Sequence, residues 1–184
     1  MNRREWLISS LSMATLPEIL AAQQHAHQAV QSAEPAGFSY LDKKTAADIE
    51  ALTSEIVPSG ETPGAREAGV VYFIDRALAT FDRGRQGLYR TGLEQANAQR
   101  KSLFPNSQSI AELSSADRIA LLHAMEASEF FQLLREHTLC GFLSDPSYGG
   151  NRGGVGWQVI GFDNQHVHHP PFGYYDAEEK EGTR

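Results

Sequence analysis

The sequence predicts an all-α protein with four main helices and a long irregular C-terminal segment packed over them. Two observations favour this class. Apolar residues recur three or four positions apart in four successive segments, which is the spacing of one helix face. The apolar–polar alternation of a strand is missing at useful length, and residues 158–161 are the only strand candidate.

The first helix is expected to begin after Asp42, because a carboxylate at this position accepts hydrogen bonds from the N–H groups of a first turn. It should end at Val57, since Pro58 cannot continue the helical ladder. For a second helix, we expect Thr62 as N-cap and Pro63 as first residue. That helix is apolar on much of its circumference up to Phe81, which indicates a central position.

A third helix is predicted over about residues 85–103, more polar and therefore more peripheral. The fourth helix, predicted to be the longest, should begin at Ser115 and continue to Phe142, because Pro146 cannot continue a helix. Together these four segments would form the bundle.

Five glycines fall within residues 149–156, too many to be retained without a reason. A flexible linker would combine glycine with serine, whereas Tyr148, Asn151, Arg152 and Trp157 interrupt or flank this run. We therefore expect an ordered loop whose backbone approaches another surface closely and whose side chains face that surface. The alternative is a structural loop that covers the helical core.

Residues 161–176 contain prolines and aromatic residues that suit an extended segment lying on a surface. The aromatic anchors would be Phe162, Phe172, Tyr174 and Tyr175. His166, His168 and His169 are the candidate metal ligands, because two imidazoles one residue apart can chelate a divalent ion in an extended chain. The alternative is that these histidines are exposed or interfacial. Residues 177–184 form a charged tail.

The first 24 residues have the layout of an export signal: Arg3 and Arg4, an apolar run over residues 6–20, then small residues. The paired arginines indicate a twin-arginine signal, which exports folded proteins through the twin-arginine translocase to the periplasm. The alternative is an ordinary amphipathic helix. The run is too short and polar to span a membrane stably. Residues 25–37 are expected to be a flexible tether, and residues 38–176 the helical domain.

Composition limits the possible partners and chemistry. A chain of 184 residues suits one domain, and its net charge of −7 disfavours nucleic acid and anionic membranes. Cys140 is the single cysteine, which rules out an internal disulfide, a thiolate–zinc motif and a haem attachment motif. It could be a buried thiol or form an intermolecular disulfide.

No catalytic or cofactor-binding residue stands out. The glycine run lacks the strand–helix context of a phosphate cradle, and Glu136 and His137, as neighbours, do not share a helix face. The sequence therefore favours a binding or partner subunit over a self-sufficient enzyme.

Several ordered blocks resemble the gluconate 2-dehydrogenase subunit 3 family: residues 58–75, 135–138, 141–151, 156–157 and 160–162. The resemblance covers roughly residues 38–176. It implies the small subunit of an exported dehydrogenase, whose large subunit is a flavoprotein of the glucose-methanol-choline type. FAD and the oxidation of gluconate, another sugar or a glycoside would belong to that partner, and a haem c subunit often completes the electron path. One twin-arginine signal would then carry both subunits.

A competing hypothesis is an independent periplasmic binding protein. It would bind sugar through Tyr148, Asn151 and Trp157, or metal through the three histidines of residues 166–169.

Overall fold

The computed structural model describes residues 37–165 and 167, and within them the chain is all-α, as predicted, without a strand. The helices are α3 (Lys43–Ile56), α4 (Val70–Ala79), α5 (Gln86–Leu103), α6 (Ser115–Met125), α7 (Glu129–Leu143) and α8 (Val155–Val159). Short 3-10 turns are η1 (Arg83–Arg85), η2 (Pro146–Tyr148) and η3 (Arg152–Gly154). The predictions for residues 1–36, for the three histidines and for Phe172, Tyr174, Tyr175 and the tail lie outside the described residues.

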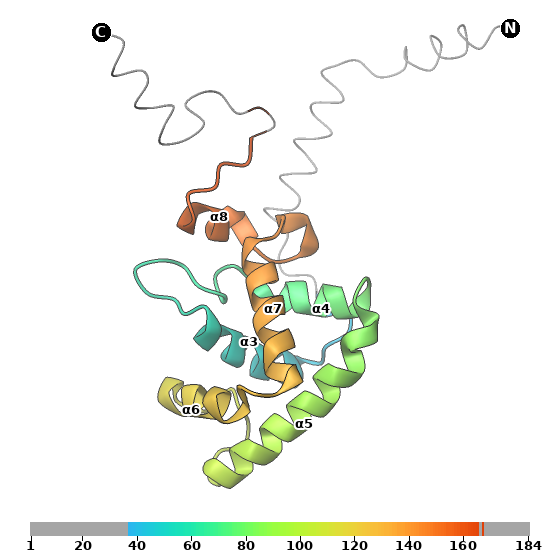
Figure 1. Ribbon diagram of the computed structural model, residues 1–184, viewed down its shortest axis with the longest axis vertical. Helices are drawn as coiled ribbons and strands as arrows, with labels where there is room; N and C mark the ends of the chain where they lie inside the picture. Colours follow the sequence, from blue (N-terminus) through green and yellow to red (C-terminus); the bar gives the residue numbers. More distant parts are fainter. Residues whose placement is uncertain (1–36, 166, 168–184) are drawn as a thin grey trace, which may run out of the picture.

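Helices α4 and α7 form the centre of the bundle: α3 packs against both, α5 packs against α7, and α6 packs against α3 and α5 (Figure 1). The central position predicted for the second helix is confirmed, because seven of the ten residues of α4 are buried. Only four of the 18 residues of α5 are buried, which confirms its peripheral position. The first helix also begins and ends as expected, with the Asp42 carboxylate accepting hydrogen bonds from the N–H groups of Lys44 and Thr45.

The predicted start of the second helix is wrong by seven residues, because α4 begins at Val70 and not at Pro63. Thr62 does not cap α4, and Pro63 is not its first residue, because residues 62–64 are irregular and residues 65–69 form turns against the end of α3. In these turns the N–H of Ala65 donates to the Val57 carbonyl at 2.8 Å. Gly69 then adopts φ +67°, a left-handed conformation that delays the helix until Val70.

The predicted longest helix is two helices. The chain leaves α6 after Met125, and the Ser128 hydroxyl accepts a hydrogen bond from the Phe131 N–H at 3.1 Å, which begins α7 anew. The apolar spacing continues across this break because both helices bury an apolar face in one core. The single strand candidate, residues 158–161, is not a strand, since α8 runs through Val159.

The chain before α3 is held by a buried carboxylate. Asp75 is 5% exposed and accepts hydrogen bonds from three consecutive backbone N–H groups, those of Ser39, Tyr40 and Leu41, at 2.8–2.9 Å. Three donors on one carboxylate satisfy the charge that burial would otherwise leave costly. The entry to the domain is thereby fixed to α4.

None of the described helices is both long and apolar enough to cross a membrane.

Candidate functional site

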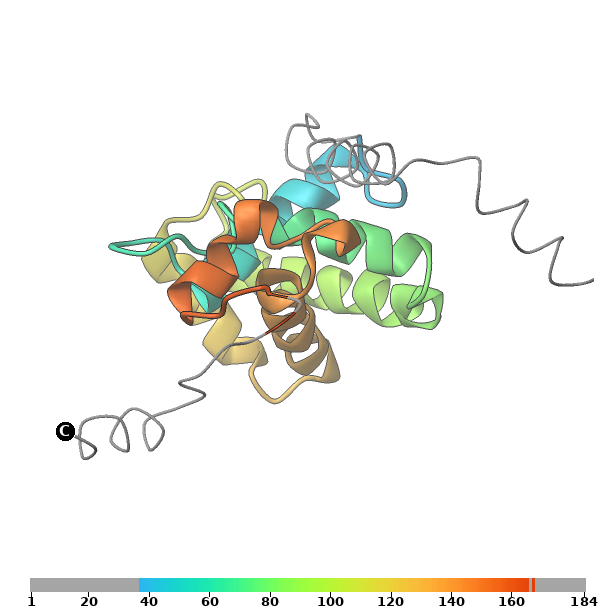
Figure 2. The same cartoon turned by 90° about the horizontal axis from the view of Figure 1, so that it is seen from above.

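The glycine-rich segment closes the C-terminal end of α7. A helix leaves its last carbonyl groups without partners within the helix. Here the N–H of Asn151 donates to the Gly141 carbonyl at 2.8 Å, and the Trp157 indole N–H donates to the Leu143 carbonyl at 2.7 Å. Figure 2 shows this segment and α8, in orange, lying across the end of the bundle. Residues 146–159 therefore cap the helix that precedes them.

The expected close approach of the glycine backbone is present, but the surface approached is the chain's own helix. A Cβ at Gly150 would lie 2.2 Å from the Gly141 carbonyl oxygen, and one at Gly156 would lie 1.9 Å from that of Phe142. No side chain fits at such distances. For the glycines, the geometry agrees with the alternative of a structural loop.

Asn151 holds this cap together from within. It is 0% exposed and adopts φ +43°, a conformation that asparagine tolerates better than most residues. Its side-chain N–H donates to the Ser144 carbonyl at 2.9 Å, while its side-chain oxygen accepts from the Gly156 N–H at 2.8 Å. Asn151 thus lies beneath the predicted interface rather than on it.

Arg152 also has an intramolecular role. Its guanidinium carbon lies 3.7 Å from the centre of the Tyr72 ring, and its backbone N–H donates to the Ala68 carbonyl at 3.0 Å. The Tyr72 ring stacks with Phe38 as well, with ring centres 5.0 Å apart. This cation–π contact ties the glycine-rich segment to α4 and to the start of the domain.

Around the cap, apolar side chains remain in contact with solvent. Phe81 is 60% exposed and meets Tyr148, 49% exposed, edge to face with ring centres 6.0 Å apart. Trp157 contacts Phe162 in the same way at 5.4 Å. We call the following exposed residues the apolar patch: Phe81, Leu139, Leu143, Tyr148, Val159, Ile160 and Phe162. Exposed aromatic side chains that contact one another, as Phe81 and Tyr148 do, are typical of a surface that binds another molecule.

Cys140 lies beside this patch on α7 and is exposed, so the buried-thiol alternative is wrong. Partial burial raises the pKa of the Cys140 thiol, and the nearby Glu136 carboxylate raises it further. Intermolecular pairing stays a prediction.

Sequence reasoning missed a buried polar network that joins three elements. The Tyr89 hydroxyl lies 3.0 Å from Nδ1 of His137, and Nε2 of His137 lies 2.9 Å from the Asp82 carboxylate. A carboxylate only accepts, so Nε2 carries the proton and Nδ1 accepts from Tyr89. The only sequence signal for this network was a histidine, His137, on the apolar face of α7. Its partners could not be identified from the sequence, because Tyr89 and Asp82 lie 48 and 55 residues away.

The order carboxylate, imidazole, hydroxyl is that of a nucleophilic relay, but the electrostatics differ. Burial lowers the pKa of His137, although the Asp82 carboxylate opposes this effect. Burial also raises the pKa of Tyr89 well above its ordinary value, with Asp82 adding to the rise. Tyr89 is 1% exposed. A buried phenol with a raised pKa is a poor nucleophile, so this network fixes side chains in place.

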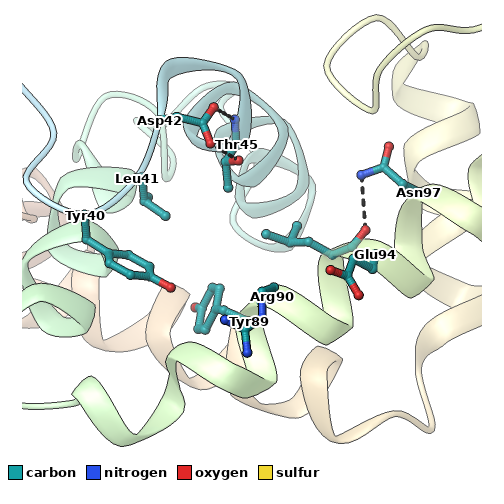
Figure 3. A pocket seen from close by; sticks show the side chains of 9 residues that line it. Tyr40, Leu41, Asp42, Thr45, Tyr89, Arg90, Glu94 and Asn97 are labelled. Carbon is teal, nitrogen blue, oxygen red and sulfur yellow. Dashed lines mark hydrogen bonds between the residues drawn. The ribbon is translucent and has the colours of Figure 1, made fainter.

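A cavity of about 430 Å³ opens between residues 40–45, at the start of α3, and residues 89–97 of α5 (Figure 3). Tyr40 and Tyr89 line it together with two leucines, Leu41 and Leu93. Arg90 and Glu94 contribute opposite charges. Sequence reasoning did not single out this cavity, because no motif connects residues 40–45 with residues 89–97.

The described residues form neither a phosphate cradle nor a metal cluster, whereas the three candidate histidines lie outside them and stay untested. The glycine-rich segment follows a helix, and the N–H groups of Asn151 and Gly156 donate to acceptors within the chain. These N–H groups are therefore not available to bind a phosphate. Among residues 37–165 and 167, no group of three or more His, Cys, Asp or Glu side chains could hold a metal ion.

The described part of the chain is a small all-α domain with exposed apolar side chains beside its glycine-rich cap. The chain belongs to the gluconate 2-dehydrogenase subunit 3 family, whose model matches residues 43–163, well over half of its length. No curated protein and no solved structure matches the chain. The resemblance read from the sequence is thereby confirmed, and the chain is an oxidoreductase subunit by family.

Proposed function

We propose that this chain is the non-catalytic small subunit of an FAD-dependent dehydrogenase of the glucose-methanol-choline type. FAD, and the oxidation of gluconate, another sugar or a glycoside, belong to the large subunit. The small subunit assists folding, stability and twin-arginine export of that partner to the periplasm, and a cytochrome c subunit can accept the electrons. Membership of a dehydrogenase subunit family supports the association with a larger subunit.

The apolar patch is the observation that carries this proposal. Its aromatic members sit on a scaffold that the Asn151 and Trp157 hydrogen bonds fix in place, so ordering it on docking costs little conformational entropy. Aromatic anchors on a rigid surface are the usual carriers of binding energy at protein interfaces. We assign Tyr148, Trp157 and Phe162 to the contact, extended by Phe81 and by Phe172, Tyr174 and Tyr175 farther along the chain.

The competing sugar-binding hypothesis loses the polar groups of two of its three proposed residues, Asn151 and Trp157, while Tyr148 stays exposed. Asn151 is buried, and both its amide and the indole N–H of Trp157 are spent on the end of α7. The Asn151 amide and the Trp157 indole N–H are therefore not free to bind a sugar hydroxyl.

Co-purification tests the docking. The FAD-bearing large subunit is co-expressed with the double variant Phe81→Ser/Tyr148→Ser, and we expect at least tenfold less of it to be recovered with the small subunit. Ile119→Ser is the matched control, because Ile119 is an exposed apolar residue on α6 outside the patch. Thermal melting first verifies that the parent chain, the double variant and the Ile119→Ser control are all folded. Equal recovery of the large subunit with all three would then exclude the patch as the docking surface.

A second experiment tests export. In the Arg3→Lys/Arg4→Lys variant, we expect both subunits to stay in the cytoplasm, since one signal serves the complex. Unchanged periplasmic activity would remove the export part of the proposal and leave docking standing.

A further inference from the structure

The cavity beside α5 is held in shape by buried partners on two sides. The backbone of Tyr40 and Leu41, on its rim, is bonded to Asp75 at 2.9 and 2.8 Å. Tyr89, at its base, is fixed by the 3.0 Å hydrogen bond to His137. A site supported by such outer hydrogen bonds is preorganised for a ligand. Its volume of about 430 Å³ falls within the range of small-molecule sites.

Not all of the polar lining is available to a ligand. The Asp42 carboxylate already accepts from the N–H groups of Lys44 and Thr45 and from the Thr45 hydroxyl, at 2.6–3.0 Å. The Asn97 side chain donates to the Leu93 carbonyl and accepts from Arg100. These groups therefore shape the cavity more than they recognise a ligand.

Arg90 and Glu94, by contrast, make no hydrogen bond or ion pair with any described residue. They stand one turn apart on α5, where residues at positions i and i+4 have Cβ atoms about 5–6 Å apart. Figure 3 shows both beside Tyr89, with the Tyr40 ring pointing toward Tyr89 from the opposite wall. One free positive and one free negative group thus lie next to an aromatic and leucine lining.

We propose that this cavity binds a small zwitterion of the aromatic α-amino-acid class. The ligand carboxylate binds the Arg90 guanidinium, the ammonium group binds Glu94, and the ring packs against Tyr40, Leu93 and Tyr89. A ligand with a carboxylate alone would place like charge beside Glu94, and one with an ammonium alone would do so beside Arg90. A molecule that carries both charges close together satisfies the pair.

Calorimetric titration of the full chain with three ligands tests this charge requirement. The ligands are L-phenylalanine, 3-phenylpropionate, which lacks the ammonium group, and 2-phenylethylamine, which lacks the carboxylate. We expect phenylalanine to bind at least tenfold more tightly than either analogue. Absence of saturable phenylalanine binding, or equal affinity for all three, would overturn the proposal.

Two variants assign the roles of the charges. Arg90→Gln should weaken phenylalanine at least tenfold without weakening phenylethylamine, and Glu94→Gln should weaken phenylalanine without weakening phenylpropionate. Lys101→Gln, an exposed cation on the same helix that does not line the cavity, should leave all affinities unchanged. An equal loss for all three ligands in either cavity variant would contradict the assignment. The titration does not contain the large subunit, so the result of the titration is independent of the docking proposal.

Discussion

Gly156 lies against the carbonyl of Phe142, at the end of α7, so closely that a Cβ at position 156 would be 1.9 Å from the oxygen. The Gly156 N–H simultaneously donates to the Asn151 side chain at 2.8 Å. One glycine therefore seats the start of α8 directly on the helix that the glycine-rich segment caps. Any larger residue must push the two elements apart.

Gly156→Ala should accordingly destabilise the domain. We expect a loss of about 1–3 kcal/mol in the free energy of unfolding, the usual cost of overpacking, measured by urea denaturation. Gly87→Ala is the control, since a Cβ there meets no atom within 4 Å and the residue lies in α5. Alanine at that helical position should be neutral or stabilise by up to about 1 kcal/mol. Equal stabilities for the two variants would contradict the packing described for Gly156.

How much of this was predictable from the sequence depends on the range of the contacts involved. The Asp42 cap and the Pro58 stop are local signals, and α3 begins and ends where they indicate. The delayed start of α4 depends on the packing of residues 64 and 65 against Val57, which no local pattern reports. The glycine run correctly predicted close backbone contact, but sequence alone could not say that the contact is with α7.

The break between α6 and α7 shows a different limit. Ser128 caps α7, yet the apolar spacing on either side of it continues as in one helix, so the spacing alone predicts no break there. The buried network of Asp82, Tyr89 and His137 was beyond reach for a third reason. It exists only because Asp82, just before η1, meets α5 and α7 in the fold.

Asp75→Asn should release the chain that leads into the domain. An amide can accept at only one of its two terminal atoms, so at least one of the three N–H groups of residues 39–41 would face a donor. We expect a loss of about 1.5–3 kcal/mol in stability, the range for a hydrogen bond to a charged group. Hydrogen exchange at residues 39–41 should accelerate in native conditions. Asp163→Asn, at an exposed aspartate, is the control. Exchange at residues 39–41 that is as slow in Asp75→Asn as in the parent chain would show that Asp75 does not hold this segment.

Cys140 should react slowly with thiol reagents at neutral pH although it is exposed. The thiolate is the reactive form, and partial burial together with Glu136 raises the pKa of the thiol. Glu136→Gln should therefore increase the alkylation rate with iodoacetamide at pH 7. Addition of the large subunit should slow it, because Cys140 lies beside the apolar patch. A rate unaffected by Glu136→Gln would show that the neighbouring carboxylate does not control the thiol.

Stability should decline on mild acidification because of His137. In the unfolded chain this imidazole takes up a proton near its ordinary pKa of 6.5, whereas burial lowers the pKa in the folded protein. Between these two values the unfolded state binds more protons, so a falling pH favours unfolding. The stability that neutral His137 contributes is fully present above pH 6.5. It is lost progressively as the pH falls toward the pKa of His137 in the folded protein.

Urea denaturation at a series of pH values from about 7.5 down to about 5 measures this effect, because carboxylates titrate mainly at lower pH. His137→Gln should abolish the slope in this window, since glutamine takes up no proton. Exposed His123 is the matched control, and His123→Gln should retain the slope. Tyr89→Phe provides a further check: it removes the hydroxyl that donates to Nδ1 of His137 and should lower stability by about 1–3 kcal/mol at pH 7.5. A slope that persists in His137→Gln would show that another group is responsible for the acid sensitivity.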